Sequence, residues 1–408
     1  MISGLLAVLV ATLQGAPQDP PGFWERETLL GDAAGVRPAL AERGVTFTLA
    51  FTGEIISCVS GGVHQDAGAD LLMDWVIDAD LDKALGWPGA AVRVNPMWLA
   101  GDGVAGDVGD LTLVSNITGR GGVRVFEAWL EQSLFDDVFS LRAGILAADQ
   151  EFILSTPGML YFNSVFGGPV FLSPNLRWPI YPVGALGARV NVALTPAVYV
   201  RAAVYDGDPG AEDVNRSGVR VRLDGADEGV FTIAEAGWTY SESLGGTVKA
   251  GGFHHSGEFA DLSSGASRRG LSGGYVVFEQ VVCRDFSSFG SNPEGGLEVF
   301  LRCGFAQEER ALVFFGLDAG LNVTGLVPGR PADILGLGVV YARISRDFAG
   351  AQPDEPAWGH ETVFEATYKI ALSPWWSLQP DVQVVVHPGG STGTPNALVV
   401  GVRIDLLF

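Results

Sequence analysis

The sequence predicts an all-β fold, a 16-stranded antiparallel transmembrane β-barrel with a short N-terminal helix. Three observations support this prediction. Segments of alternating apolar and polar residues recur along the chain, and 47% of the 408 residues are hydrophobic while only 18% are charged. Beyond the N-terminus, no apolar run reaches the ~18 residues that a spanning helix needs. A barrel accounts for all three, because each strand turns apolar side chains toward lipid on one face only.

The first 44 residues differ from the rest of the chain. Residues 1–16 form a short apolar segment that is typical of a secretory signal peptide. Residues 17–44 begin rich in proline, then continue as a short helical stretch that ends at Gly44. We therefore expect an exported protein with a helical periplasmic segment over 17–44 and a barrel over 45–408.

From Val45 onward the apolar residues recur with a period of two. Val45, Phe47 and Leu49 share one face of the first segment, and Thr46 and Thr48 share the other. The predicted strands are 45–57, 70–82, 89–99, 123–135, 138–147, 183–194, 197–206, 230–240, 246–255, 271–283, 296–306, 311–323, 334–344, 361–372, 375–387 and 396–408. This even number of segments, each long enough to cross a bilayer as a tilted strand, favours a membrane barrel.

The connections between these segments alternate in length. Turns such as 194–197 and 373–376 are short, whereas 100–122, 148–182, 207–229 and 345–360 are long, as is usual at the two ends of a membrane barrel. Loop 284–295 departs from this rule because it is long at the short-turn end. A soluble β-sandwich also alternates, but its dry core would not accept unpaired Arg, Glu and Asp in the middle of strands.

The polar faces of the strands then line a lumen wide enough for water. They interleave arginines with carboxylates, so most of the net charge of −22 falls on loops, turns and the N-terminal segment. A ring of one sign selects ions, whereas paired charges offer hydrogen-bonding groups with little net field, which suits a neutral, hydroxyl-rich solute. The alternative for any one of these residues is simple pairing in a wet lumen.

Loop 148–182 is long and rich in aromatic residues, prolines and glycines. These features predict a compact loop that folds inward and narrows the channel. Phe152, Phe162, Phe166 and Trp178 are the candidate constriction residues. Two roles stay open for their rings, which either stack on the faces of a sugar or pack the loop against the barrel wall.

Little in the sequence indicates metal, cofactor or enzyme chemistry. Cys58, Cys283 and Cys303 form no CxxC motif, and a disulfide between Cys283 and Cys303 across a hairpin stays open. His254 and His255 precede Ser256, but adjacent strand residues face opposite ways, and no GxSxG occurs. We expect no cofactor, no metal and no enzyme; an outer-membrane hydrolase is the remote alternative. The acidic charge also argues against nucleic acid as a partner.

At this level of detail the chain resembles the OprB family of carbohydrate-selective porins from Gram-negative outer membranes. The resemblance rests on an ordered set of segments: GDAAGVRPALAERGVTF, GEIISCVSGG, FEAWLEQSLFDDVFSLRAGIL, YFNSVFGGP, YPVGALGARV, YVRAAVYDGDPG, FTIAEAGWTY, VKAGGFHHSGEF, GLVPGRPADILGLGVVYARIS, LSPWWSLQPDVQVVVHPGG and NALVVGVRIDLLF. One departure is Ala33, where the family usually has tryptophan. The resemblance implies a porin for passive uptake of mono- or small oligosaccharides, with a weak saccharide-binding constriction.

The resemblance and the alternation together define candidate site residues. The candidate pore-lining residues are Arg93, Glu127, Trp129, Glu131, Arg142, Arg189, Arg201, Glu235, Lys249, Arg302, Asp318, Glu365, Lys369 and Arg403. Phe408 resembles the C-terminal aromatic that the barrel assembly machinery reads. Expected partners are sugars, outer-membrane lipid and that machinery, in a monomer or a homotrimer. A barrel for carboxylates or for general diffusion is the alternative.

Overall fold

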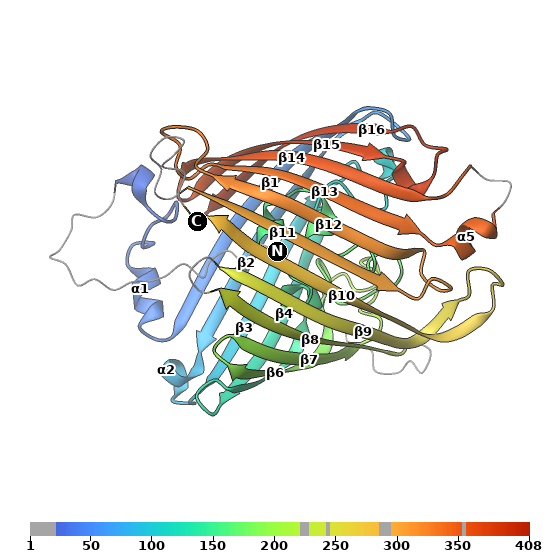
Figure 1. Cartoon of the computed structure of the whole chain (residues 1–408). Coiled ribbons are helices and arrows are strands. Elements are labelled where there is room, and N and C mark those ends of the chain that lie inside the picture. Colours follow the sequence, from blue (N-terminus) through green and yellow to red (C-terminus); the bar gives the residue numbers. More distant parts are fainter. Residues whose placement is uncertain (1–21, 221–227, 242–244, 285–294, 353–355) are drawn as a thin grey trace.

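The computed structural model describes residues 22–220, 228–241, 245–284, 295–352 and 356–408. Its strands close into one barrel, which confirms the predicted fold (Figure 1). Every strand is antiparallel to its neighbours, and β1 pairs with β16. The strands are β1 Val45–Ser60, β2 Ala67–Asp80, β3 Ala90–Gly101, β4 Gly122–Leu134, β5 Phe139–Leu146, β6 Ala185–Thr195, β7 Val198–Asp206, β8 Val230–Ser241, β9 Gly246–Ala260, β10 Ser267–Cys283, β11 Gly296–Ala306, β12 Val313–Thr324, β13 Ile334–Ile344, β14 His360–Ser373, β15 Trp376–Val386 and β16 Ala397–Leu407.

The two faces of the barrel wall differ in a way that only a membrane protein tolerates. In β1, Glu54 is 3% exposed whereas its neighbour Ile55 is 65% exposed. The same inversion recurs around the barrel, where the outward side chains include Leu130, Val200, Val204, Phe278, Phe305, Phe364, Val402 and Ile404. The outward apolar side chains contact the lipid chains of the membrane, and the charged side chains lie on the inward face.

The two ends of the barrel carry different connections. The short-turn end, on the left of Figure 1, also carries α1 (Val36–Ala41) and α2 (Leu81–Leu85), and the long-loop end carries α5 (Arg346–Gly350). Short turns face the periplasm in barrels of this kind, and long loops face the outside. None of the helices among the described residues is long and apolar enough to cross a membrane. The predicted signal peptide and most of loop 284–295 lie outside the described residues.

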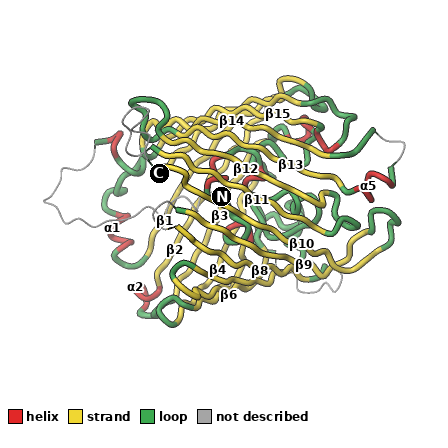
Figure 2. The backbone as a smooth tube through the Cα atoms, viewed as in Figure 1, coloured by secondary structure: helices red, strands yellow, loops and turns green. Residues whose placement is uncertain are grey.

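Two long loops enter the barrel from the long-loop end. We call residues 147–184 the inner loop; it contains the 3-10 turns η2 (Ala148–Gln150), η3 (Pro157–Leu160) and η4 (Ser164–Phe166). Residues 102–121 form the second loop, with α3 (Ala105–Val108). Figure 2 shows loop segments and short helices within the outline of the strands. The remaining short elements are η1 (Phe23–Glu25) and η5 (Pro388–Gly390).

The strict alternation read from the sequence fails at one point in β4. A period of two places Phe126 outward with Ala128 and Leu130, yet Phe126 is only 1% exposed and packs edge-on against Tyr181 of the inner loop. The register between β3 and β4 shifts between Asn95 and Pro96. Proline lacks the amide hydrogen that a strand ladder needs, so a bulge forms opposite it and turns Phe126 inward.

The structure also decides the open cysteine question. In the β10–β11 ladder, Cys283 lies opposite Leu297, near one end, while Cys303 lies opposite Val276, well along the ladder. All three cysteines are free. A disulfide between Cys283 and Cys303 is therefore excluded by the strand register, because two bridged cysteines must lie within about 7 Å at their Cα atoms.

Candidate functional site: the pore wall and the inner loop

Carboxylates on the barrel wall hold the backbone of the inner loop. Glu365 accepts hydrogen bonds from the N–H groups of Phe162 (2.5 Å) and Asn163 (3.1 Å). Glu235 accepts one from Ile153 at 2.9 Å, and Glu127 accepts one from Ala147 at 3.3 Å. A turn-rich loop inside a barrel has many amide groups without strand partners, and these wall acids satisfy them.

Cationic side chains of the wall bind the loop carbonyls in the same way. Arg302 is fully buried; it pairs with Asp318 at 2.9 Å and donates to the carbonyl of Ile153 at 2.8 Å and to that of Val165. Lys249 donates to the Leu154 carbonyl and Arg201 to the Glu151 carbonyl, both at 2.7 Å. These contacts fix the inner loop across several strands.

The aromatic side chains of the inner loop pack it against the wall. Phe152, Phe162 and Phe166 have no exposed surface and Trp178 has 2%. Phe162 lies under the Arg403 guanidinium, 3.9 Å from its ring centre, and Phe166 stacks on Tyr161. Of the two roles that the sequence left open for these rings, the structure shows packing against the wall. The four rings lie buried between the loop and the wall. Strand alternation could not predict this, because it gives no information about the direction of side chains in a loop.

The second loop is anchored beside the inner loop. Arg403 pairs with Glu54, which lies directly opposite it in the ladder, and donates to the Asn116 side chain at 2.7 Å. Ser115 donates to Glu54, and Asn116 donates to the Tyr161 carbonyl at 2.8 Å. Ser115 and Asn116 were not predicted as site residues, because loops lack the regular alternation of apolar and polar residues that identified the wall.

The fourteen predicted pore-lining residues thus separate into two groups. The buried group lies beneath the loops: Glu127, Trp129, Arg189, Glu235, Arg302, Asp318, Glu365 and Arg403. The others keep part of their surface: Arg93, Glu131, Arg142, Arg201, Lys249 and Lys369. All fourteen side chains belong to the charged, inward face, but only the second group retains surface for contact with a solute.

Phe408, the predicted assembly signal, follows β16 and donates its N–H to the Leu49 carbonyl at 2.9 Å. That the barrel assembly machinery recognises Phe408 stays a prediction.

Four partly exposed charged residues, Asp78, Arg93, Glu131 and Arg142, cross strands β2 to β5. We call these four residues, together with the buried Trp129 that supports them, the pore strip. Arg93 pairs with Asp78 and Arg142 pairs with Glu131, at 2.7 and 2.8 Å. The Trp129 ring lies between the two guanidiniums, 5.4 Å from that of Arg93 and 3.7 Å from that of Arg142. Each arginine thus lies within cation–π distance of the Trp129 ring and is neutralised by a carboxylate.

The inner loop adds Glu151 to this row. Its carboxylate contacts Arg142 at 2.5 Å and Arg189 at 2.6 Å. Burial alone would raise the pKa of Glu151, but the hydrogen bond from Arg189 and the charge of Arg142 lower it below the ordinary value. The carboxylate is therefore charged at neutral pH, and it joins the loop to β5 and β6.

The neighbouring Asp149 is buried without such a partner. Its Oδ2 accepts from the Tyr181 N–H at 3.3 Å, and its Oδ1 has no hydrogen-bond partner among the described residues. Burial raises the pKa of Asp149 to about 6. A carboxyl whose pKa is raised in the folded state lowers the stability of that state in full above pH 6. The cost shrinks as pH falls from 6 toward the ordinary Asp pKa near 4, below which the side chain is protonated in both states.

We therefore predict that Asp149→Asn stabilises the folded barrel at pH 7–8, by on the order of 2–3 kcal/mol, and has little effect near pH 4. Asparagine keeps the acceptor for Tyr181 and removes the charge. The measurement is the free energy of unfolding in urea between pH 4 and 8. A gain that does not depend on pH would show that the carboxylate charge is not the cause.

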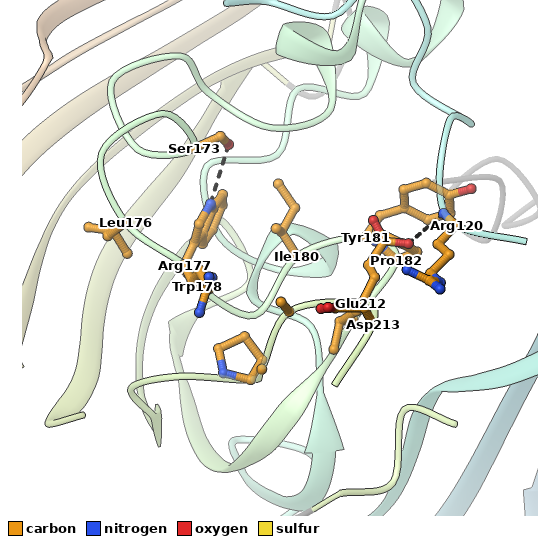
Figure 3. Close-up of a pocket in the computed structure, with 14 residues that line it drawn as sticks. Arg120, Ser173, Leu176, Arg177, Trp178, Ile180, Tyr181, Pro182, Glu212 and Asp213 are labelled. Atoms are coloured by element: carbon orange, nitrogen blue, oxygen red, sulfur yellow. Dashed lines mark hydrogen bonds between the residues drawn. The ribbon is translucent and has the colours of Figure 1, made fainter. Parts of the chain in front are cut away.

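A cavity of about 510 Å³, which we call the vestibule, lies at the long-loop end between the inner loop, the second loop and residues 209–213 (Figure 3). Glu212, which follows β7, accepts a hydrogen bond from the Arg120 N–H at 2.6 Å and pairs with the buried Arg124 at 3.1 Å. Trp178 forms part of the lining, and its indole donates to Ser173 at 3.3 Å. The contacts around the vestibule connect the inner loop, the second loop and the segment after β7 at the long-loop end of the lumen.

A closed barrel with an apolar outer band, short turns at one end and an inner loop held on a charged wall defines a class: a porin of the Gram-negative outer membrane, a channel and not an enzyme. Residues 65–408 match the family described as "Carbohydrate-selective porin, OprB family". The chain belongs to that family.

Individual relatives are distant but cover nearly the whole chain. Porin B of Pseudomonas aeruginosa is 24% identical over 93% of this chain and 91% of its own length. The putative porin QuiX of Acinetobacter baylyi is 22% identical over 95% of this chain and 94% of its own length. A solved high-pH structure of Pseudomonas putida OprB superposes with a TM-score of 0.85 at 23% identity, covering 95% of this chain and 100% of the other, which supports the same fold.

Proposed function

We propose that the protein lets mono- and small oligosaccharides diffuse passively across the outer membrane, with weak saccharide binding at the pore strip. The observation that carries the proposal is the pair of arginines, Arg93 and Arg142, which are partly exposed, oriented on Trp129 and each matched by a carboxylate. The family description supports the same class of solute.

The chemistry of the pore strip fits a neutral, hydroxyl-rich solute. A guanidinium has five N–H donors in a fixed plane, and a carboxylate has two acceptor oxygens, so one ion pair can hold two adjacent hydroxyl groups. Because each arginine already has its counter-charge, the strip exerts little net attraction on ions. A hydroxyl group here only replaces water, so binding is weak and release is fast, as passage requires.

We predict that the double variant Arg93→Lys/Arg142→Lys weakens saccharide binding about tenfold while leaving ion conductance nearly unchanged. Lysine keeps the charge but loses the planar fork and the stacking on Trp129. Purified protein is placed in a planar bilayer, and the ion current is recorded as a disaccharide is added. The wild-type current should fall with sugar, and the half-saturating concentration should rise about tenfold in the double variant, equivalent to ~1.4 kcal/mol.

Arg43→Lys serves as the matched control, because Arg43 is exposed in the N-terminal segment and its substitution leaves the pore intact. An open channel whose current is insensitive to sugars would overturn the proposal. Block by a small carboxylate in place of sugar would favour the alternative of a porin for other small solutes. Equal sugar block in wild type and double variant would remove the pore strip from the binding site.

A further inference from the structure

The described part of the N-terminal segment, residues 22–44, makes specific contacts at the junction of β1 and β16. All other neighbouring strands of the described barrel are consecutive in the sequence, and loops or turns join them. The β1–β16 pair lacks such a connection, and we call this junction the seam. A closed barrel opens most readily at its seam, because separating two strands there requires no loop to stretch.

The seam is incomplete at the short-turn end. The ladder between β1 and β2 begins at Val45, whereas the ladder between β1 and β16 begins at Ala50, opposite Leu407. Residues 45–49 of β1 therefore extend beyond β16. Backbone groups on that side of β1 would lack partners, as at the edge of an open sheet. Leu49 finds one in the N–H of Phe408.

The N-terminal segment supplies hydrogen-bond partners for Phe47 and for the end of β16. Arg37, in α1, donates to the carbonyl of Phe47 at 3.0 Å and also to the carbonyl of Phe408. Its guanidinium lies 4.5 Å from the centre of the Phe47 ring. Leu29 donates its N–H to the carbonyl of Leu407 at 2.8 Å. The segment thus binds both strands of the seam at once.

A second attachment lies two strands from β1. Trp24 stacks on Trp375 and Trp376, at 5.7 and 6.3 Å between ring centres, where β14 turns into β15. Phe23 packs edge-on against Trp375 and accepts a hydrogen bond from its indole at 3.2 Å. Trp24 remains 58% exposed. Aromatic side chains collect at the rims of membrane barrels, where one side is apolar and the other wet.

We propose that residues 22–44 form a strap that closes the seam, with Arg37 binding the carbonyls of Phe47 and Phe408, and with Trp375 and Trp376 binding Trp24. The strap bridges β1, β16 and the β14–β15 turn, so the seam opens only after the strap has detached. Its effect is on the rate at which the closed barrel opens and unfolds. This role is independent of the solute that passes through the pore.

The test compares Arg37→Ala and Trp24→Ala with Arg43→Ala, which removes the same charge from the same segment at an exposed position. Each protein is refolded into phosphatidylcholine vesicles. Unfolding is followed by the loss of the compact band on unboiled gels during incubation in urea. Arg37→Ala should unfold about tenfold faster, since a hydrogen bond to a charged donor contributes roughly one power of ten or more in stability. Trp24→Ala should unfold several-fold faster than the wild type, and Trp24→Phe should unfold at a rate between those of the wild type and Trp24→Ala.

Backbone hydrogen exchange locates the effect. The amides of Leu29 and Phe408 bond across the strap and the seam, so their exchange should speed up in Arg37→Ala, while amides in the β10–β11 ladder keep their protection. Conductance and sugar block in these variants should match the wild type. Unfolding rates and exchange equal to those of Arg43→Ala would overturn the strap. An absence of sugar block in every protein would count against the proposed transport and leave the strap unaffected.

Discussion

Arg302→Ala should destabilise the folded barrel by about 3–5 kcal/mol, because it leaves a buried carboxylate without its counter-charge. Arg302 is fully buried and Asp318, directly opposite in the β11–β12 ladder, is 2% exposed. Asp318 Oδ2 already has no hydrogen-bond partner among the described residues, so loss of the guanidinium leaves the carboxylate without its strongest contact.

The same substitution should release the inner loop. The carbonyls of Ile153 and Val165 each lose their donor from Arg302, and these two residues lie on either side of η3. A loop that moves away from β11 widens the lumen, so single-channel conductance should rise or fluctuate between levels. Unfolding in urea from vesicles and single-channel recording are the two measurements.

The double variant Arg302→Ala/Asp318→Ala separates charge from packing. Removing both partners eliminates the uncompensated charge, so part of the lost stability should return, while the loop carbonyls still lack a donor and the conductance stays altered. A single variant as stable as the wild type, with an unchanged conductance, would show that Arg302 does not anchor the loop.

The strand pattern was predictable because successive wall residues face lipid and the aqueous lumen in turn. Lipid favours apolar side chains and the lumen favours polar or charged ones, so the two kinds alternate along each strand. Glu54 beside Ile55 shows the contrast at its clearest. The rule failed where the backbone itself departed from a regular ladder, as at Phe126, whose bulge depends on Pro96 in the neighbouring strand. The alternation of residues within β4 contains no information about a proline in the neighbouring strand β3.

The candidate site was harder to predict than the wall. Alternation identified Glu235, Arg302 and Glu365 as inward residues, but their function depends on where the inner loop lies. The loop covers them, so they bind backbone groups and have no surface for a solute. Glu151 went unnoticed for the converse reason: it lies on a loop, where sequence position carries no information about direction, and only the folded loop brings it to Arg142 and Arg189.

Glu151 is also where a single charge should change the permeation properties most. Its carboxylate neutralises two arginines at once, and its lowered pKa keeps it charged at neutral pH. In Glu151→Gln both guanidiniums keep an ion pair with Glu131 alone among the described carboxylates. The pore strip then gains one net positive charge in a confined lumen, where fields are screened less than in bulk water.

We expect the anion-to-cation permeability ratio of Glu151→Gln to rise several-fold at low salt, and the difference to shrink as ionic strength increases. The reversal potential across a tenfold KCl gradient measures the ratio, at ~10 mM and again near 1 M. Glu42→Gln is the control, since Glu42 is exposed in the N-terminal segment outside the lumen. A sugar block that weakens together with the change in ion selectivity would place Glu151 in the saccharide site; an unchanged reversal potential would mean that the ion path avoids this side of the inner loop.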